Sequence, residues 1–161
     1  MPNLLAENKK AYFNYQILET FEAGVELKGF EVKAIKTGRV NLTGAFATLK
    51  RSHGGRSTEI WLTNADIPPY QPKNTPADYD PRRSRRLLLK RSEIQYLIGK
   101  LQAERLTMVP LKVYNKGGLI KIELGLGRGK RKYEKREVIK KRDAQREIRR
   151  ALKSQSLVAK P

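Results

Sequence analysis

Residues 107–126, TMVPLKVYNKGGLIKIELGL, form two runs of alternating apolar residues on either side of a glycine-rich turn. The alternating residues are Val109, Leu111, Val113, Ile120, Ile122, Leu124 and Leu126. A period of two is typical of strands with one buried face. Because Asn115–Gly118 can turn the chain back on itself, the stretch predicts a β-hairpin.

Four further segments upstream carry strand signals. They are Tyr12–Thr20, Asn41–Lys50, Thr58–Asn64 and the apolar run Leu87–Leu89. Residues 67–81 hold five of the eight prolines, so we expect a long loop there rather than a helix or a central strand. With the hairpin, these segments give six strands.

Two segments carry helix signals. Glu31–Lys36 is a short candidate that Gly38 closes. Ser92 and Gln95 match a capping box at the start of the second candidate helix. Its apolar residues share one helical face: Ile94, Leu97, Ile98 and Leu101. The sequence therefore predicts a mainly β protein with one or two short helices, whose six strands form a small closed or partly open barrel.

The charge balance restricts the class of protein. Thirty-five Lys and Arg against 16 Asp and Glu give a net charge of +19, which draws the chain towards polyanions. The absence of cysteine and the single histidine exclude disulfides and multi-histidine metal sites. No apolar run approaches the ~18 residues of a membrane span, and the N-terminus lacks signal- and transit-peptide features. We therefore expect a cytoplasmic protein with no membrane partner.

The positive charge is concentrated at the C-terminus. Residues 127–161 carry 14 basic and 4 acidic side chains, a net charge of +10, and only scattered apolar residues. We predict a barrel domain over residues 1–127 and a basic tail over residues 128–161. The tail should be disordered when free and helical when bound to an anionic surface.

Two basic clusters are candidates for nucleic-acid contacts. Arg82–Arg86 (RRSRR) offers guanidinium groups that bind phosphate bidentately. Gly127–Arg136 mixes glycines, cations and Tyr133, whose ring could stack on an unpaired base. A solvated basic loop and an unspecific linker fit the same residues, and the composition alone leaves both alternatives open.

No catalytic constellation is evident in the sequence. His53 lies in a polar loop without a nucleophile pattern, and the spacing of Glu22, Glu26 and Glu31 compels no catalytic pair. We therefore expect no enzyme, no cofactor and no metal. Besides an RNA-binding adaptor, the charge leaves a structural ribosomal protein or a small basic RNA-processing enzyme as alternatives.

Four ordered motifs make the chain resemble the bacterial SsrA-binding protein (small protein B) family over about residues 5–153. They are Asn8–Tyr12, Phe21–Lys33, Asp80–Leu89 and Gly129–Arg136. The second motif, FEAGVELKGFEVK, is the most specific of the four. The chain departs from the family pattern at Glu134, where Asp is usual, and at Ala144, where the tail has an aromatic residue.

The resemblance implies an OB-fold-like barrel that binds the tRNA-like domain of transfer-messenger RNA (tmRNA) in trans-translation, the rescue of stalled ribosomes. Its tail would occupy the decoding centre and the empty message channel, against ribosomal RNA. The implied partners include the elongation factor Tu complex that carries the aminoacylated RNA, and we expect a monomer. The implied tmRNA-binding residues are Asn8, Lys9, Glu22, Lys33, Arg83, Arg85, Arg86 and Leu88. The implied ribosome-binding residues are Lys130, Arg131, Lys132, Tyr133, Glu134, Lys135, Arg136 and Leu152.

Overall fold

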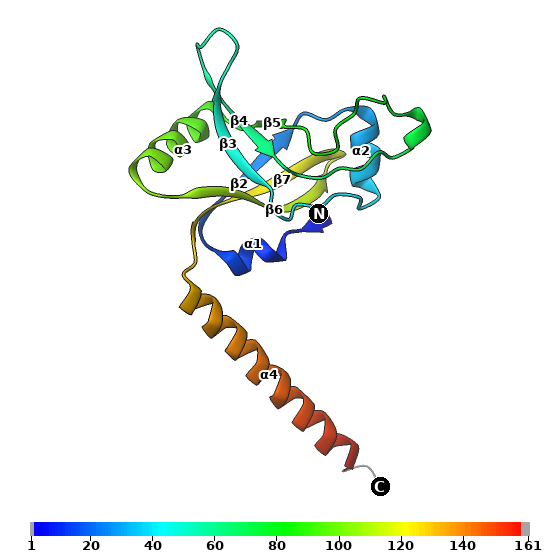
Figure 1. Ribbon diagram of the computed structural model, residues 1–161, viewed down its shortest axis with the longest axis vertical. Coiled ribbons are helices and arrows are strands. Elements are labelled where there is room, and N and C mark those ends of the chain that lie inside the picture. The colour runs from blue at the N-terminus through cyan, green and yellow to red at the C-terminus, as the bar shows by residue number, and fades with distance from the viewer. Residues whose placement is uncertain (1, 159–161) are drawn as a thin grey trace. The chain divides into compact units, whose positions relative to one another are not determined.

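The computed structural model describes residues 2–158 of the chain. Contacts between residues divide the chain into two compact units, residues 1–129 and 130–161. Within the described residues, the first unit is a β-barrel with short helices, and the second consists of one long helix (Figure 1).

The first unit contains seven strands among its described residues. They are β1 (Asn3–Glu7), β2 (Tyr15–Val25), β3 (Phe46–Arg51), β4 (Thr58–Thr63), β5 (Arg85–Leu88), β6 (Thr107–Lys116) and β7 (Leu119–Gly129). Its helices are α1 (Lys9–Asn14), α2 (Gly29–Lys36) and α3 (Arg91–Ala103), with a 3-10 turn η1 (Pro72–Asn74) in the proline-rich loop. The second unit holds α4 (Lys132–Val158).

Six of the strands close into a ring. They follow the order β6-β3-β4-β5-β2-β7, and β7 pairs back with β6. β1 pairs with the C-terminal half of β6, where Asn3 lies opposite Asn115. β3 pairs with the N-terminal part of β6, at Met108. The predicted six-stranded barrel is confirmed, and β1 is a seventh strand that the sequence analysis did not identify.

The alternating residues of the β6–β7 hairpin are buried in two clusters. Val113, Ile120, Ile122, Leu124 and Leu126 belong to the main core of the barrel, whereas Val109 and Leu111 pack with Ala11 of α1. Val109, Leu111, Val113, Ile122, Leu124 and Leu126 are all at most 3% exposed. Leu97 of α3 is fully buried in the main core, and Ile94 and Leu101 pack against it. The spacing thus predicted which residues are buried, but a register shift between Pro110 and Lys112 places Val109 and Leu111 in the cluster with α1 and not in the barrel core.

The start of the first predicted strand is wrong, because residues Lys9–Asn14 form α1 and β2 begins at Tyr15. Asn8 caps this helix: its Oδ1 accepts a hydrogen bond of 3.2 Å from the Ala11 N–H. Its Nδ2 donates to the carbonyl oxygens of Leu42 and Pro110 at 3.1 and 3.0 Å. Contacts from distant parts of the chain thus override the local alternation.

Three other predicted details differ from the structure. α3 begins at Arg91, and its first turn is capped by the Glu93 carboxylate, which accepts a 3.0 Å hydrogen bond from the Lys90 N–H, so the Ser92–Gln95 capping box is wrong. β3 begins at Phe46, five residues after the predicted start. Residues 128–129, which the prediction gave to the tail, are the end of β7 and pair with β2.

Candidate nucleic-acid interface

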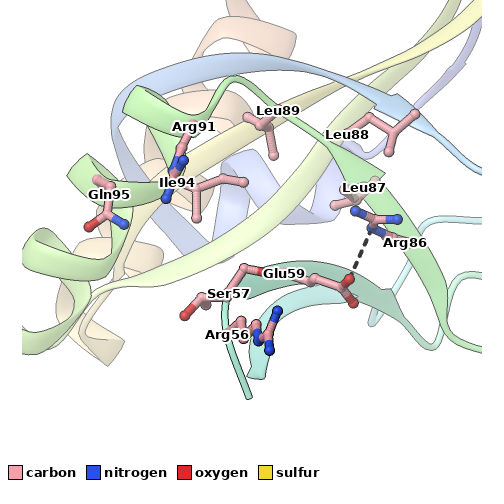
Figure 2. Close-up of a pocket in the computed structure, with 11 residues that line it drawn as sticks. Arg56, Ser57, Glu59, Arg86, Leu87, Leu88, Leu89, Arg91, Ile94 and Gln95 are labelled. Carbon is pink, nitrogen blue, oxygen red and sulfur yellow. Dashed lines mark ion pairs between the residues drawn. The ribbon is translucent and has the colours of Figure 1, made fainter. Parts of the chain in front are cut away.

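A cavity of about 500 Å³ lies between α3 and the neighbouring strands β4 and β5. Three guanidinium groups line it: Arg56 from the β3–β4 loop, Arg86 from β5 and Arg91 from the first turn of α3 (Figure 2). We call these three residues and the cavity the arginine groove. Leu88, Leu89 and Ile94 are among its apolar lining residues.

The arginine groove keeps a positive charge. Glu59 is the one carboxylate among its lining residues, and its Oε1 lies 3.5 Å from Arg86 Nε. On the other side, Glu26 Oε1 lies 3.3 Å from Arg86 Nη1, yet the Arg86 side chain stays 42% exposed. The two ion pairs therefore orient Arg86 without burying it, and the groove can bind phosphate groups bidentately.

Of these three arginines, the sequence analysis identified only Arg86 as a binding residue. Arg56 and Arg91 lie about 30 residues before it and five residues after it, and neither belongs to a local motif. They reach the same cavity because the β3–β4 hairpin and α3 flank β5. No local sequence signal could have found them.

Glu22 and Leu88, two predicted RNA-binding residues, share the outer face of the barrel. Gly24 of β2 is opposite Leu88 of β5, and Glu22 is two residues from Gly24, so both side chains point to the same side of the sheet. Leu88 is 46% exposed. The structure thus brings together two residues that lie 66 positions apart in the sequence.

Glu22 is held in its charged form on this outer face. A hydrogen bond donated by Tyr114 Oη lowers the pKa of the Glu22 carboxyl, and Lys116 Nζ, 3.3 Å from Oε2, acts in the same direction. Burial and the Glu22 charge raise the pKa of Tyr114, so its hydroxyl remains a donor. An exposed, ionised carboxylate can accept hydrogen bonds from ribose hydroxyls or base amines.

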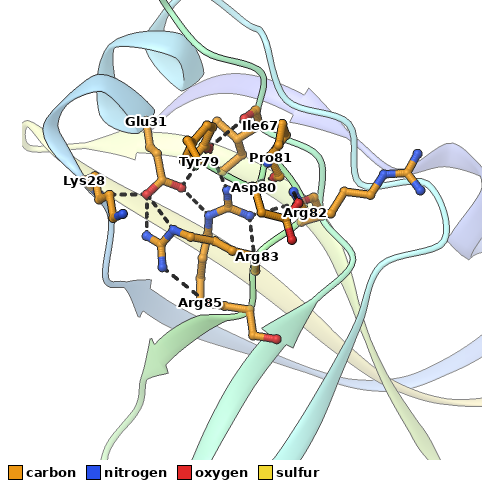
Figure 3. A network of polar contacts seen from close by, with 11 residues as sticks. Lys28, Glu31, Ile67, Tyr79, Asp80, Pro81, Arg82, Arg83 and Arg85 are labelled. Carbon is orange, nitrogen blue, oxygen red and sulfur yellow. Dashed lines mark hydrogen bonds and ion pairs between the residues drawn. The ribbon is translucent and has the colours of Figure 1, made fainter. Parts of the chain in front are cut away.

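Glu31 is at the centre of a buried polar cluster that joins α2 to the loop before β5 (Figure 3). Both of its carboxylate oxygens accept hydrogen bonds from guanidinium groups, Oε1 from Arg83 and Oε2 from Arg85. The Lys28 N–H donates to Oε1 at 3.0 Å. We call Glu31, Arg83, Arg85 and Tyr79 the Glu31 cluster.

Arg85 makes the largest number of contacts in this cluster. Besides Glu31, its guanidinium donates to the Tyr79 hydroxyl at 3.0 Å and to three backbone carbonyl oxygens, those of Ala65, Pro81 and Arg83, at 2.9–3.0 Å. Arg85 is completely buried. The prediction that Arg85 contacts RNA is therefore wrong for this structure, because its guanidinium is shielded from solvent and hydrogen-bonded internally.

The buried carboxyl of Glu31 titrates below its ordinary range. Burial by itself raises the pKa of Glu31, but the hydrogen bonds from Arg83, the Lys28 N–H and Arg85 together lower it below the ordinary value of 4.5. The carboxylate is therefore ionised at neutral pH, and its charge is compensated by two guanidinium groups.

The remaining predicted RNA-binding residues lie apart from one another. Asn8 is buried and uses its side chain to cap α1, so its role in the free protein is structural. Lys9 is exposed on α1 and Lys33 is exposed on α2. Arg83 is 27% exposed and is hydrogen-bonded to Glu31, so only part of it can reach a ligand.

Most of the predicted ribosome-binding residues lie in α4. Tyr133 and Leu152 are 55% and 62% exposed, and Ile148 is 59% exposed. The Glu134 carboxylate accepts a 2.9 Å hydrogen bond from the Arg131 N–H, as expected of an acidic residue in a first helical turn. α4 has the helical form predicted for the bound tail, and the disorder of the free tail stays a prediction.

Neither a metal-ligand set nor a membrane span is found in the part of the chain that the structure describes. Residues 2–158 contain no group of three or more His, Cys, Asp or Glu placed to hold a metal ion. None of the helices in these residues is long and apolar enough to cross a membrane.

Replacing Glu31 with Gln should lower the free energy of unfolding by about 3–5 kcal/mol, because the buried guanidinium of Arg85 and the partly exposed guanidinium of Arg83 lose their counter-charge. The folded-state pKa of Glu31 is lowered, so its stabilising contribution is complete above pH 4.5 and declines as the pH falls through the folded pKa. The difference in the free energy of unfolding between wild type and Glu31→Gln should therefore be constant near neutral pH and become smaller in acid. Chemical denaturation at several pH values measures it.

Glu26→Gln is the matched control, because Glu26 also pairs with an arginine but is 53% exposed. Glu26→Gln should lower the free energy of unfolding by no more than about 1 kcal/mol at any pH. If Glu31→Gln and Glu26→Gln lowered the free energy of unfolding by the same amount, burial of the Glu31 cluster would not be what stabilises this part of the barrel.

Comparison with known proteins gives one consistent result. A family model described as SmpB protein matches residues 5–154. The SsrA-binding protein of Synechococcus elongatus is 49% identical over 150 residues, which cover 93% of this chain and 94% of that protein. The SsrA-binding protein of Carboxydothermus hydrogenoformans is 49% identical over 154 residues, which cover 96% of this chain and 99% of that protein.

A solved structure agrees with these relatives. A chain from a structure described as "tmRNA-SmpB: a journey to the center of the bacterial ribosome" is 44% identical and superposes with a TM-score of 0.62. The match covers 83% of this chain and 93% of that chain. Since the family model and these relatives cover more than nine tenths of the chain, and the solved structure matches most of it, the chain belongs to the SmpB family of SsrA-binding proteins.

Proposed function

We propose that this protein binds tmRNA through its barrel and acts with it on stalled ribosomes in trans-translation. The observation that carries the proposal is the extent of the family match, which covers residues 5–154 and so includes the barrel and most of α4. The relatives are named SsrA-binding proteins, and the solved relative is described together with tmRNA and the bacterial ribosome.

The arginine groove and the outer face supply complementary contacts for a structured RNA. Arg56, Arg86 and Arg91 offer positive charge to the phosphate backbone, which fixes the position of an RNA without reading its sequence. Glu22 and Leu88 offer an acceptor and an apolar contact to ribose and exposed base surfaces. This combination suits the tRNA-like domain, a folded RNA with both duplex and unpaired parts.

α4 supplies the ribosome-binding element in this proposal. It contains ten basic and four acidic residues, and Tyr133, Ile139, Ile148 and Leu152 in it are exposed. A helix of this composition gains little from an apolar core, so an anionic surface is its natural partner. Ribosomal RNA around the decoding centre and the empty message channel offers such a surface.

We propose an adaptor rather than an enzyme. The two carboxylates nearest the arginine groove, Glu26 and Glu59, are ion-paired with Arg86, so they position a cation instead of acting as acid or base. A structural ribosomal protein is the alternative with a similar charge, and it would remain with ribosomes through a high-salt wash. Since the ribosome and the elongation factor Tu complex are cytoplasmic, we propose that the protein acts there, as a monomer.

Arg56→Gln and Arg91→Gln should each weaken binding to the tRNA-like domain of tmRNA and reduce its dependence on salt. Each lost phosphate contact should make the slope of log affinity against log salt shallower by about 0.7–0.9. Filter binding of the transcribed RNA domain at four or more salt concentrations measures both quantities.

Arg105→Gln is the control for the lost charge, because Arg105 is exposed in the α3–β6 connection and does not line the groove. It should leave the slope close to that of the wild type. If all three variants kept the wild-type slope, the arginine groove would not be the phosphate-binding surface. If the wild-type protein failed to bind the RNA, the proposed function itself would be refuted.

Tyr133→Ala should slow peptide transfer to aminoacylated tmRNA on stalled ribosomes while leaving affinity for free tmRNA unchanged. The Tyr133 ring is 55% exposed in the first turn of α4, so its removal should not destabilise the barrel. Stacking of a ring on an unpaired base contributes about 1–3 kcal/mol. Single-turnover peptide transfer and RNA binding in solution are the paired measurements.

Tyr133→Phe keeps the ring and should preserve most of the transfer rate. The assignment of Tyr133 to the ribosome would be refuted by a Tyr133→Ala protein that transfers at the wild-type rate. It would also be refuted if that variant mainly lost affinity for free tmRNA.

A further inference from the structure

A second cavity, of about 310 Å³, lies between α2 and the proline-rich loop that follows β4. Its lining residues are Gly29, Phe30 and Lys33 from α2, and Tyr70, Gln71, Asn74 and Thr75 from the loop. Figure 1 shows the two segments side by side at one end of the barrel. We call this cavity the α2 pocket. Lys33 is a predicted tmRNA-binding residue, and the other residues that line the pocket have no role in the contacts described above.

Two aromatic rings form part of the walls of the α2 pocket, and both are fixed by other contacts. The Phe30 ring meets the Tyr79 ring edge to face, with centroids 4.7 Å apart and planes at 90°. Tyr70 packs against the hydrophobic core. Rings that are already fixed lose little conformational entropy when a planar ligand stacks on them.

The polar lining offers hydrogen-bonding groups of both kinds. Asn74 Nδ2 donates to Gln71 Oε1 at 2.8 Å, and Thr75 Oγ1 donates to the Gln71 carbonyl at 2.7 Å. The first bond orients the two side-chain amides, and neither bond uses Asn74 Oδ1 or Gln71 Nε2. The pocket therefore presents an acceptor and a donor beside aromatic rings, which matches the edge of a nucleobase.

Cations surround the α2 pocket. Lys33 lines it, Lys73 is exposed between the lining residues Gln71 and Asn74, and Arg39 Nη1 contacts the Tyr70 carbonyl at 3.5 Å. No carboxylate is among the seven described residues that line the cavity. The charge around the pocket thus suits the phosphates on either side of a bound base.

We propose that the α2 pocket binds one unpaired nucleotide of the RNA, with its base stacked on an aromatic wall and its edge hydrogen-bonded to Asn74 or Gln71. This inference rests on the proposed function, since it assumes that the barrel binds an RNA. The nucleotide must be unpaired, because a base inside a duplex offers neither its face nor its Watson–Crick edge. The volume is sufficient for a single nucleoside and small for a stretch of several bases.

The test uses the full chain and two RNA probes of equal length, an unstructured single strand and a blunt duplex. Phe30→Leu keeps an apolar side chain but removes the ring, and it should weaken single-strand binding roughly 5- to 150-fold. Phe30→Trp keeps an aromatic face and should bind the single strand as well as the wild type. Affinity for the duplex should be the same for all three proteins.

An exposed polar residue gives a second variant with little risk to folding. Asn74→Ala should weaken single-strand binding less than Phe30→Leu, without changing duplex binding, because Asn74 is exposed in η1. Photocrosslinking identifies the nucleotide of the single strand that contacts Tyr70 or Phe30. Replacing that nucleotide with an abasic site should weaken binding to the wild-type protein by the same factor as Phe30→Leu weakens binding of the intact strand.

The outcomes separate this inference from the proposed function. Equal single-strand affinity for wild type, Phe30→Leu and Asn74→Ala, with tmRNA still bound, would overturn the nucleotide pocket and leave the adaptor role intact. Photocrosslinks confined to residues outside the α2 pocket would overturn it as well. Loss of affinity for both probes in Phe30→Leu would assign Phe30 a structural role and contradict the proposal.

Discussion

The buried carboxylate of Glu31 is the interaction on which the RNA-facing parts of the barrel depend. It ties α2 to Arg83, in the loop before β5, and to Arg85, the first residue of β5, which are 52 and 54 residues further along the chain. Taking one carboxylate and one guanidinium fully out of water is costly, and only a complete set of hydrogen bonds offsets that cost. Arg85 has such a set, since it donates to the Tyr79 hydroxyl and three backbone carbonyls as well as to Glu31.

The Glu31 cluster lies between the two places where we expect RNA to bind. On one side, Arg85 is followed by Arg86, whose guanidinium lines the arginine groove, and by Leu88 on the outer face. On the other side, Glu31 follows Gly29 and Phe30, which line the α2 pocket, and Tyr79 supports the Phe30 ring. One internal ion cluster thus links the surface groups of β5 to those of α2. Within the RRSRR motif, which resembles a phosphate-binding run, Arg85 is buried and structural whereas Arg86 lies at the surface.

Structural features that have a local sequence pattern could be predicted from the sequence. Features that depend on contacts between residues far apart in the chain could not. Alternation over residues 107–126 predicted the β6–β7 hairpin and its buried residues, because every second residue of a strand points to the same side. It did not predict the register shift in β6 that places Val109 and Leu111 against α1. α1 was missed because Asn8 is held by carbonyl groups of Leu42 and Pro110, far from it in sequence. The burial of Arg85 depends on Glu31, 54 residues away, and Arg56 joins Arg91 only through the folded barrel. Charge and resemblance predicted the RNA-binding class, but not which arginines are available to RNA.

We propose a division of roles in which the barrel binds tmRNA and α4 acts on the ribosome. A fragment of residues 1–129 tests it most directly, because it ends with β7 and retains every residue of the first unit. We predict that the fragment unfolds cooperatively and binds the tRNA-like domain of tmRNA at physiological salt, but supports no peptide transfer to aminoacylated tmRNA on stalled ribosomes. Transfer by the fragment at the full-length rate, or a folded fragment that no longer binds tmRNA, would contradict the account.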